Sequence, residues 1–241
     1  MQIKIIMNIL LLGEYSNFHN TLKKGLIKLG HDVVLAGRKD GFKCLPVDIS
    51  FDPITLTKPP LKYIRAIIFR LTKFDIAIIE TAYLFQKNKK KLKSFDVVQL
   101  INEYPIKTSP FIDKILLRYI FKHNSKVIVS ACGTDTLYLN YILKESLPYH
   151  ILTPYIKNPS LKKHFKYSLM YLNNSHKKLS NYVIKNVSQI IPADIDYYMA
   201  YKNHYKVKPL IPFPINLDTL SYIPPVLKGI IKIYKESLLV N

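Results

Sequence analysis

The chain has 241 residues, of which 49% are hydrophobic and only 7 are glycine, a composition that excludes disordered and fibrous proteins. Its 36 lysines and arginines exceed its 16 acidic residues and give a formal net charge of +20, which favours polyanionic partners. The basic residues are spread in small groups without a helix-turn-helix, zinc-finger or RNA-binding signature, so nucleic acid is not an expected partner. Anionic lipid headgroups and phosphorylated substrates remain as the expected polyanionic partners.

The N-terminal residues 1–15 predict a buried strand and not a signal peptide. The apolar run follows a lysine but lacks a small-residue cleavage site and ends in Gly-Glu. No stretch approaches the roughly 18 to 20 apolar residues that a membrane span requires. Cys44 and Cys132 lack any metal-ligand spacing, and we expect both to be buried, reduced thiols. The expected protein is cytoplasmic, and any membrane contact would be peripheral, on the inner face.

The chain then alternates short apolar runs with longer amphipathic ones. Residues 7–13 predict a central parallel strand, residues 17–30 a helix that ends at Gly30, and residues 32–37 a second strand, which together make a βαβ unit. Further strands are predicted at 74–80, 95–103, 126–133 and 188–194, and helices at 59–74, 111–124 and 161–185. The expected fold class is α/β, a doubly wound, mostly parallel Rossmann-like sheet with helices on both faces.

Polar loops follow three of these strands, at the sheet edge where such folds bind ligands. Gly13 would let a ligand approach the backbone closely, and the helix that follows it favours an anion such as a diphosphate. His19 would either reach the same cleft or face solvent. Helix capping by Ser16, Asn17, Asn20 or Asp135 is the plainer explanation for each loop. Three such loops at one edge favour a shared cleft, with the candidate residues Gly13, Glu14, Tyr15, Ser16, Asn17, His19, Asn102, Glu103, Gly133, Thr134 and Asp135.

Two predicted helices, at 61–73 and 111–124, carry apolar and basic residues together. Such a helix either packs its apolar face into the core, with its lysines in water, or lies on an anionic membrane surface. Because amphipathic helices usually pack inward, we expect both to belong to the core.

Four segments, in this order and spacing, resemble the N-terminal domain of GT-B glycosyltransferases of the family 4 type. They read "MNILLLGEYSNFHNTLKKGLIKLGHDVVLAG", "FDVVQLINE", "VIVSACGTDT" and "IPFPINLD". The resemblance implies an enzyme of two Rossmann-like domains, of which the N-terminal one holds the acceptor and the C-terminal one the nucleotide-sugar. Residues 1–225 would be the acceptor-binding domain. Residues 226–241 would be the interdomain crossing and the first strand of a donor domain that this chain does not continue.

The resemblance implies hexosyl transfer from a nucleotide-sugar to a glycan or lipid-linked acceptor, in the synthesis of a surface polysaccharide or glycolipid. The residues that bind the donor would lie in the missing half, so no cofactor, no metal and no catalytic residue is assigned here. Half a cleft cannot bring donor and acceptor together, and we expect the chain to be inactive alone. Because the family resembled is retaining, Glu103 and Asp135 are expected to contact acceptor hydroxyls before acting as a base.

A second hypothesis makes the chain a non-catalytic module, which either lies on a membrane surface or recruits a separate donor-domain subunit. An exposed apolar surface would mark such a partner. A Rossmann oxidoreductase is disfavoured, because the first loop reads G-E-Y-S-N-F and lacks the glycine fingerprint of that class.

Overall fold

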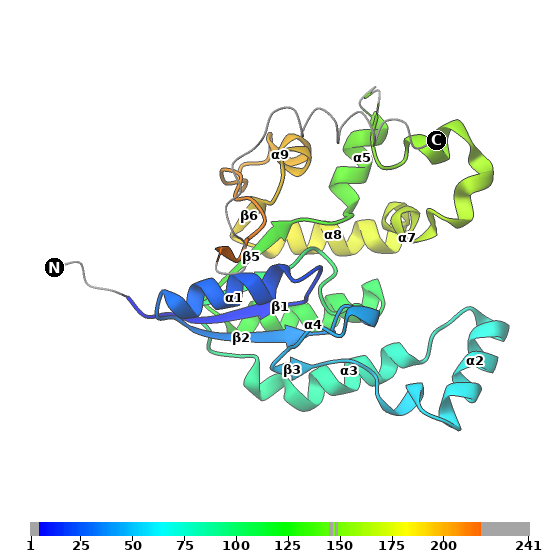
Figure 1. Ribbon diagram of the computed structural model, residues 1–241, viewed down its shortest axis with the longest axis horizontal. Coiled ribbons are helices and arrows are strands. Elements are labelled where there is room, and N and C mark those ends of the chain that lie inside the picture. Colours follow the sequence, from blue (N-terminus) through cyan, green and yellow to red (C-terminus); the bar gives the residue numbers. More distant parts are fainter. Residues whose placement is uncertain (1–4, 145–146, 148, 218–241) are drawn as a thin grey trace.

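The computed structural model, which describes residues 5–144, 147 and 149–217, has a single parallel sheet in that part of the chain (Figure 1). Its six strands lie in the order β3-β2-β1-β4-β5-β6. They are β1 (Asn8–Leu12), β2 (Asp32–Gly37), β3 (Ile49–Ser50), β4 (Val97–Leu100), β5 (Lys126–Ala131) and β6 (Gln189–Pro192). This strand order is that of the doubly wound Rossmann-like sheet, so the predicted fold class is confirmed.

Helices cover both faces of the sheet because β1 directs alternate side chains to opposite sides. Leu10 and Leu12 pack in one cluster with residues of α4 (Pro110–His123) and α8 (Asn174–Asn186), whereas Ile9 and Leu11 pack on the other face with α1 (Phe18–Lys28). The three leucines of β1 are fully buried, which explains why this strand is apolar throughout.

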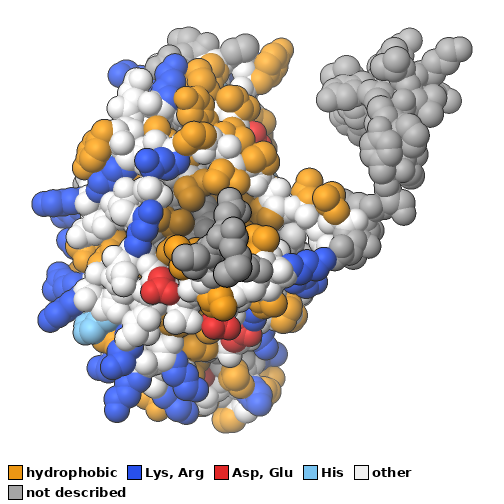
Figure 2. Space-filling view, turned by 90° about the vertical axis from the view of Figure 1, so that its left-hand side faces the viewer, with side chains coloured by type: hydrophobic (Ala, Val, Ile, Leu, Met, Phe, Trp, Pro, Cys, Tyr) orange, Lys and Arg blue, Asp and Glu red, His pale blue; other side chains and the backbone are white. Residues whose placement is uncertain are grey.

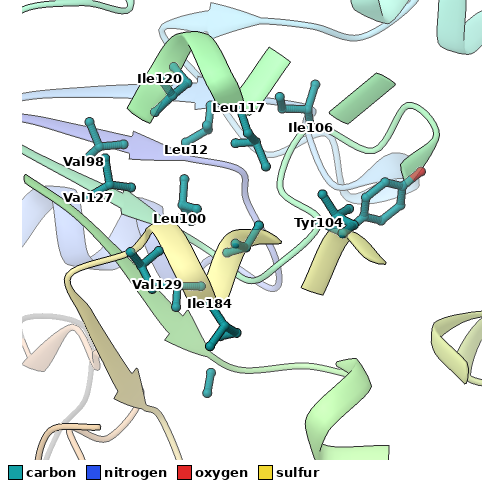
Figure 3. Packing of buried hydrophobic residues seen from close by; sticks show 14 of the residues in the cluster. Leu12, Val98, Leu100, Tyr104, Ile106, Leu117, Ile120, Val127, Val129 and Ile184 are labelled. Atoms are coloured by element: carbon teal, nitrogen blue, oxygen red, sulfur yellow. The ribbon is translucent and has the colours of Figure 1, made fainter. Parts of the chain in front are cut away.

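The main core lies between the strands and the helices α4 and α8. Figure 3 shows Leu12 of β1 facing Leu117 and Ile120 of α4, and Val129 of β5 beside Ile184 of α8. Because the central strands are held on both faces, their carboxyl ends are fixed relative to one another.

The remaining helices are shorter or lie at the periphery. They are α2 (Leu61–Thr72), α3 (Ala77–Asn88), α5 (Thr136–Lys144), α6 (Thr153–Lys157), α7 (Lys166–Leu169) and α9 (Ile195–Tyr201). Short 3₁₀ turns lie at Gly41–Lys43, Thr55–Thr57, Lys89–Lys91, Pro159–Lys163 and Met170–Leu172. Within the described residues, none of these helices is both long and apolar enough to cross a membrane.

The predicted strand at 74–80 is wrong, because α3 begins at Ala77. A short apolar run does not distinguish a strand from a buried helical segment. The deciding pattern continues further along: Ala77, Thr81 and Phe85 are buried at intervals of four, which is the helical period. The third strand is instead the two-residue β3, too short to produce a pattern.

Two other predictions are also wrong. The helix predicted at 161–185 is divided into 3₁₀ turns and α7 before α8 begins, and the extended backbone of Asn173 separates the last of these turns from α8. Cys132 is buried as predicted, but Cys44 is exposed. The donor-domain strand predicted within 226–241 lies outside the described residues, so the domain division stays a prediction.

The last described segment returns to the first helix. Ile211 N–H donates to the Pro192 carbonyl at 3.0 Å, beside β6. The Phe213 ring then meets the Phe18 ring of α1 edge-on, with centroids 5.1 Å apart. Residues 211–217 therefore cross from the end of the sheet to α1.

Candidate functional site

The sheet has a topological switch point between β1 and β4, because the chain leaves these neighbouring strands in opposite directions. From β1 it continues through α1 to β2, and from β4 through α4 to β5. Ligands of such sheets bind outside the carboxyl ends of the two strands at this point. Here these ends lead into the loops at 13–17 and 101–109, so two of the three loops predicted from the sequence flank it.

Gly13 is required by packing at this point. Its φ is +90°, and a Cβ atom there would lie 2.3 Å from Ile101 Cγ2. The backbone of Gly37 is also close, since a Cβ atom on Gly37 would lie 2.9 Å from Gly13 Cα. The close approach that the glycine allows is therefore to β4 and β2 within the protein.

Glu14 caps α1, the helix predicted to receive an anion. Its Oε2 accepts hydrogen bonds from the backbone N–H and the side-chain amide of Asn20, at 2.8 and 2.6 Å. Asn17, which precedes the helix, makes no capping bond with its side chain. The carboxylate of Glu14 thus already occupies the N-terminus of α1, where an anionic ligand was expected. Burial raises the pKa of Glu14, and its Oε1 has no hydrogen-bond partner.

His19 is fully buried, so the expectation that it faces solvent is wrong. Its Nδ1 donates to the Gly13 carbonyl at 2.6 Å, because a carbonyl can only accept. Burial lowers the pKa of His19 to about 4, which leaves the ring neutral at pH 7. Its Nε2 then carries a buried lone pair without a partner.

Glu103 and Asp135 both serve the N-terminus of α5. Glu103 Oε1 accepts from the backbone N–H and the hydroxyl of Thr136, at 3.0 and 2.6 Å. Asp135 Oδ1 accepts from Tyr138 N–H at 2.7 Å, which confirms the capping role, and its Oδ2 accepts from the Tyr201 hydroxyl at 3.0 Å. The loop after β4 is thereby tied to the loop after β5.

These two carboxyl groups hold their protons more readily than exposed ones. Burial is the main cause of the raised pKa of each, and the charge of Glu103 raises the pKa of Asp135 further. The Ser180 hydroxyl lies near enough to Glu103 to lower its pKa somewhat, yet it does not reach hydrogen-bonding geometry, and Glu103 Oε2 is unpartnered. Both carboxyl groups are buried and already accept hydrogen bonds from α5, so neither is placed to take a proton from an acceptor at the exposed side of the edge.

The candidate residues differ in access to solvent. Ser16, Asn17 and Gly133 are exposed, and Tyr15 and Thr134 are partly exposed. The others are buried: Gly13, Glu14, His19, Asn102, Glu103 and Asp135. The structure therefore gathers all three loops at one edge of the sheet, with Ser16, Asn17 and Gly133 outside and the carboxyl and imidazole groups beneath them.

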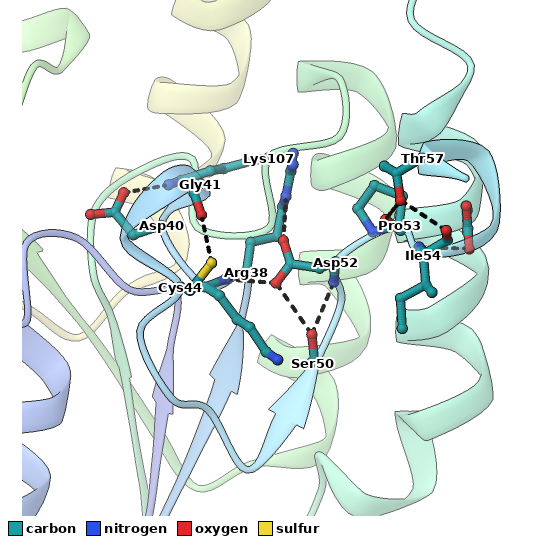
Figure 4. A network of polar contacts seen from close by, with 12 residues as sticks. Arg38, Asp40, Gly41, Cys44, Ser50, Asp52, Pro53, Ile54, Thr57 and Lys107 are labelled. Carbon is teal, nitrogen blue, oxygen red and sulfur yellow. Dashed lines mark hydrogen bonds and ion pairs between the residues drawn. The ribbon is translucent and has the colours of Figure 1, made fainter. Parts of the chain in front are cut away.

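A basic cluster at this edge was not singled out from the sequence. Lys107 Nζ lies 3.6 Å from the centre of the Tyr15 ring and 3.7 Å from Asp40 Oδ1. Asp40 also accepts from Ser16 N–H and from Lys43 Nζ, both at 2.9 Å. Figure 4 shows Lys107 in contact with Asp40, which lies in the loop after β2. The same rule about carboxyl ends, applied to the second strand and to the whole loop after the fourth, would have found it.

Lys107 is held in an unusual state. Burial lowers its pKa to about 8, although the nearby Asp40 opposes that shift. Its backbone is left-handed, with φ 64°. The buried Asp113 fixes this loop, because its carboxylate accepts from the N–H groups of Lys107 at 3.2 Å and Thr108 at 2.9 Å.

Backbone strain concentrates at the same edge. Three further non-glycine residues there have positive φ: Ser16 (51°), Asn17 (69°) and Asp40 (57°). Such conformations cost on the order of 1 kcal/mol each and are found most often at ligand sites. Within the described residues, no group of three His, Cys, Asp or Glu side chains is placed to hold a metal ion.

Comparisons with known proteins assign no family. No family model matches the chain, and no curated protein matches it. The glycosyltransferase assignment rests on the four quoted segments alone.

Proposed function

We propose that this chain is the acceptor-binding half of a GT-B glycosyltransferase that transfers a hexose to a glycan or lipid-linked acceptor. One observation carries the proposal. Three of the segments that resemble this family form β1-α1-β2, β4 and β5, which include the two strands at the switch point and place their loops at one edge. Every parallel sheet places these loops at one edge, so the arrangement supports the site, and the resemblance of the quoted segments supports the family.

The exposed groups at this edge suit an acceptor with hydroxyls and a phosphate. Ser16 and Thr134 can exchange hydrogen bonds with sugar hydroxyls, and the partly exposed Lys107 supplies a cation beside them. With a pKa of about 8, Lys107 is largely protonated at neutral pH. The buried layer beneath, Glu103 included, then positions these loops without reacting. Transfer itself depends on a nucleotide-sugar, whose main binding site we place outside this chain.

Calorimetry on the purified chain tests whether it binds the acceptor but not the nucleotide-sugar donor. UDP-glucose and GDP-mannose, as representative donors, should bind only weakly, whereas a polyprenyl-diphosphate-linked sugar in detergent should bind. Lys107→Met should weaken that binding about tenfold, since a charge-assisted contact to phosphate is lost. Lys87→Met, on the exposed end of α3, is the control. Tight binding of either donor by the chain would contradict the proposal.

We further propose that the protein works in the cytoplasm, in peripheral contact with an anionic membrane. The charge of +20 supports this, and Figure 2 shows lysine and arginine side chains along one side of the face that it views. A module without catalytic function, which docks on a membrane or recruits a donor-domain subunit, is the second candidate. One observation favours it: α2 leaves an apolar face in solvent. Binding of the polyprenyl-diphosphate sugar separates the two, because only the acceptor-binding domain requires it.

A further inference from the structure

Helix α2 contributes nothing to the core. None of its twelve residues is buried, whereas each of α1, α3, α4, α5 and α8 has buried positions. Figure 1 shows it at a corner of the molecule, beyond β3 and α3. The expectation that this amphipathic helix packs its apolar face inward is therefore wrong, while α4, the other amphipathic helix, packs as expected.

The face that α2 turns to solvent is strongly apolar. Ile64, Ile67 and Leu71 are spaced at i, i+3 and i+7, which places them on one side of a helix. Their exposed fractions are 48%, 60% and 77%. Tyr63 and Phe74, at either end of this row, are 60% and 43% exposed. A row of this kind is unfavourable in water unless something covers it.

The charges around this row have one sign. From residue 58 to residue 74 the sequence holds five basic residues and no acidic one. Arg65 is neutralised by a bidentate pair with Asp75, with both N–O distances 2.7 Å. The remaining basic residues, Lys58, Lys62, Arg70 and Lys73, are exposed. The apolar row is thus bordered by uncompensated positive charge.

The helix is also held firmly at its base. The Arg65–Asp75 pair joins it to the segment that begins α3. Glu80 of α3 accepts hydrogen bonds from the backbone N–H groups of Ile54, Thr55 and Leu56, in the turn that leads into α2. The exposed row is therefore presented in a fixed orientation.

We propose that α2 is an interfacial helix, which inserts Ile64, Ile67 and Leu71 into the surface of an anionic lipid bilayer. An apolar row bordered by lysine and arginine fits an acidic membrane surface, where the apolar side chains enter the headgroup boundary and the basic ones meet lipid phosphates. Twelve residues span roughly 18 Å, too short to cross a bilayer, so the helix lies in the plane of the surface. A second copy of the chain fits less well, because two such helices would bring like charges together.

This inference rests on the peripheral membrane association proposed above and names the element responsible. A second basic surface keeps the two separable. Lys89, Lys90 and Lys91, which follow α3, are exposed without an accompanying apolar row. Binding through that surface would be electrostatic only and would insert no side chain.

Fluorescence tests the insertion directly, because the chain contains no tryptophan. Ile67→Trp and the control Ile27→Trp, on α1 and 50% exposed, each give a protein with a single tryptophan, which is excited at a wavelength that the 18 tyrosines do not absorb. On titration with vesicles of phosphatidylglycerol and phosphatidylcholine, the emission of Ile67→Trp should shift to shorter wavelength and that of Ile27→Trp should not. Vesicles of phosphatidylcholine alone should leave both spectra unchanged.

Co-sedimentation with the same vesicles measures affinity. Ile67→Glu should lower the partition coefficient at least about tenfold, because it places a charge where an apolar side chain enters the boundary, whereas Ile27→Glu should not. The pair Lys62→Gln/Arg70→Gln should lower it roughly 25-fold, at about fivefold per basic residue, and Lys89→Gln/Lys90→Gln much less.

The outcomes are distinguishable. If the wild-type chain binds anionic vesicles but Ile67→Glu binds equally well, or if Ile67→Trp shows no shift, the role of α2 is overturned while membrane association stands. If the wild-type chain ignores anionic vesicles, both are overturned. Neither result bears on the glycosyltransferase proposal, since no donor or acceptor is present. Recovery of Ile67→Trp as a dimer in solution, with no effect of lipid, would assign the face to a second copy instead.

Discussion

The carboxyl edge of the sheet and helix α2 are built in opposite ways. At the edge, Glu14, His19, Glu103 and Asp135 are almost completely buried, and each is bonded to backbone groups of the loops that it joins. Helix α2 buries no residue and is held to the body mainly by polar contacts at its base. The first region has the fixed geometry that a specific ligand needs, and the second leaves an apolar row in solvent, which we propose enters a membrane surface.

The largest expected difference between the regions is in stability. Leu100→Ala, at a fully buried position in β4, should lower the free energy of unfolding by about 2 to 5 kcal/mol. Ile67→Ala, on the exposed row of α2, should change it by less than about 0.5 kcal/mol. Urea denaturation followed by circular dichroism measures both. A large loss from Ile67→Ala would mean that α2 is covered in solution, and the comparison would fail.

The buried histidine predicts acid sensitivity at the edge. Because the pKa of His19 is lowered to about 4 from an unfolded value near 6.5, the unfolded state binds more protons between these values. Stability should therefore fall as the pH drops from 6.5 to 4, by on the order of 3 kcal/mol from this residue. His19→Gln should remove that part of the loss and flatten the profile.

Urea denaturation at a series of pH values measures this effect, with His164→Gln, an exposed position, as the control. His176 shares the expected direction, because burial lowers its pKa to about 4 as well, so part of the acid loss should persist in His19→Gln. A profile identical to that of the wild type would show that folding does not lower the pKa of His19.

Alanine substitution at two glycines distinguishes a position where packing requires glycine from one where it does not. Gly13→Ala should cost about 2 kcal/mol, because the new Cβ would meet Ile101 at a backbone angle that favours glycine. Gly25→Ala, within α1, should instead stabilise by up to about 1 kcal/mol, since no atom lies within 4 Å of the Cβ and alanine favours helix. Thermal unfolding of both variants checks the opposite signs. Tolerance of alanine at Gly13 would imply that β1 and β4 can separate.

The smallest effect is expected at the base of α2. The Arg65–Asp75 pair is about one-third exposed on each side, so Arg65→Gln should cost at most about 1 kcal/mol. Arg65→Gln should, however, loosen the attachment of α2. It should therefore lower the affinity for vesicles by a larger free energy than it lowers the stability of the fold. Equal binding by Arg65→Gln and the wild type would show that the orientation of α2 does not matter.

The sequence predicted the central part of the fold because those strands are buried on both faces. The continuous apolar run of β1 and the helical period of α1 are strong local patterns, and both elements were found within a residue or two. The failures lie at the sheet's other edge, where β3 has only two residues and the apolar start of α3 resembles a strand. There the local sequence pattern is short, and contacts with residues distant in the sequence decide whether a segment becomes a strand or a helix.

The candidate site was predicted as a place but not as a set of contacts. The rule about strand ends located Glu14, Glu103 and Asp135, yet no sequence pattern indicates that their carboxylates turn inward to cap helices. Lys107 was missed because its significance comes from Tyr15 and Asp40, which lie far from it in the sequence. The exposure of α2 was not predicted, because an amphipathic period is the same whether the apolar side meets a core or faces solvent.

Hydrogen exchange measured by mass spectrometry tests the separation of the two regions most directly. Anionic vesicles alone should slow exchange in residues 58–74, where little burial protects the helix at present. Vesicles that also carry a polyprenyl-diphosphate-linked sugar should additionally slow exchange in residues 13–19, 102–108 and 133–136. If the acceptor protects none of these loops, or if the vesicles protect the sheet edge and leave α2 unchanged, the account is contradicted.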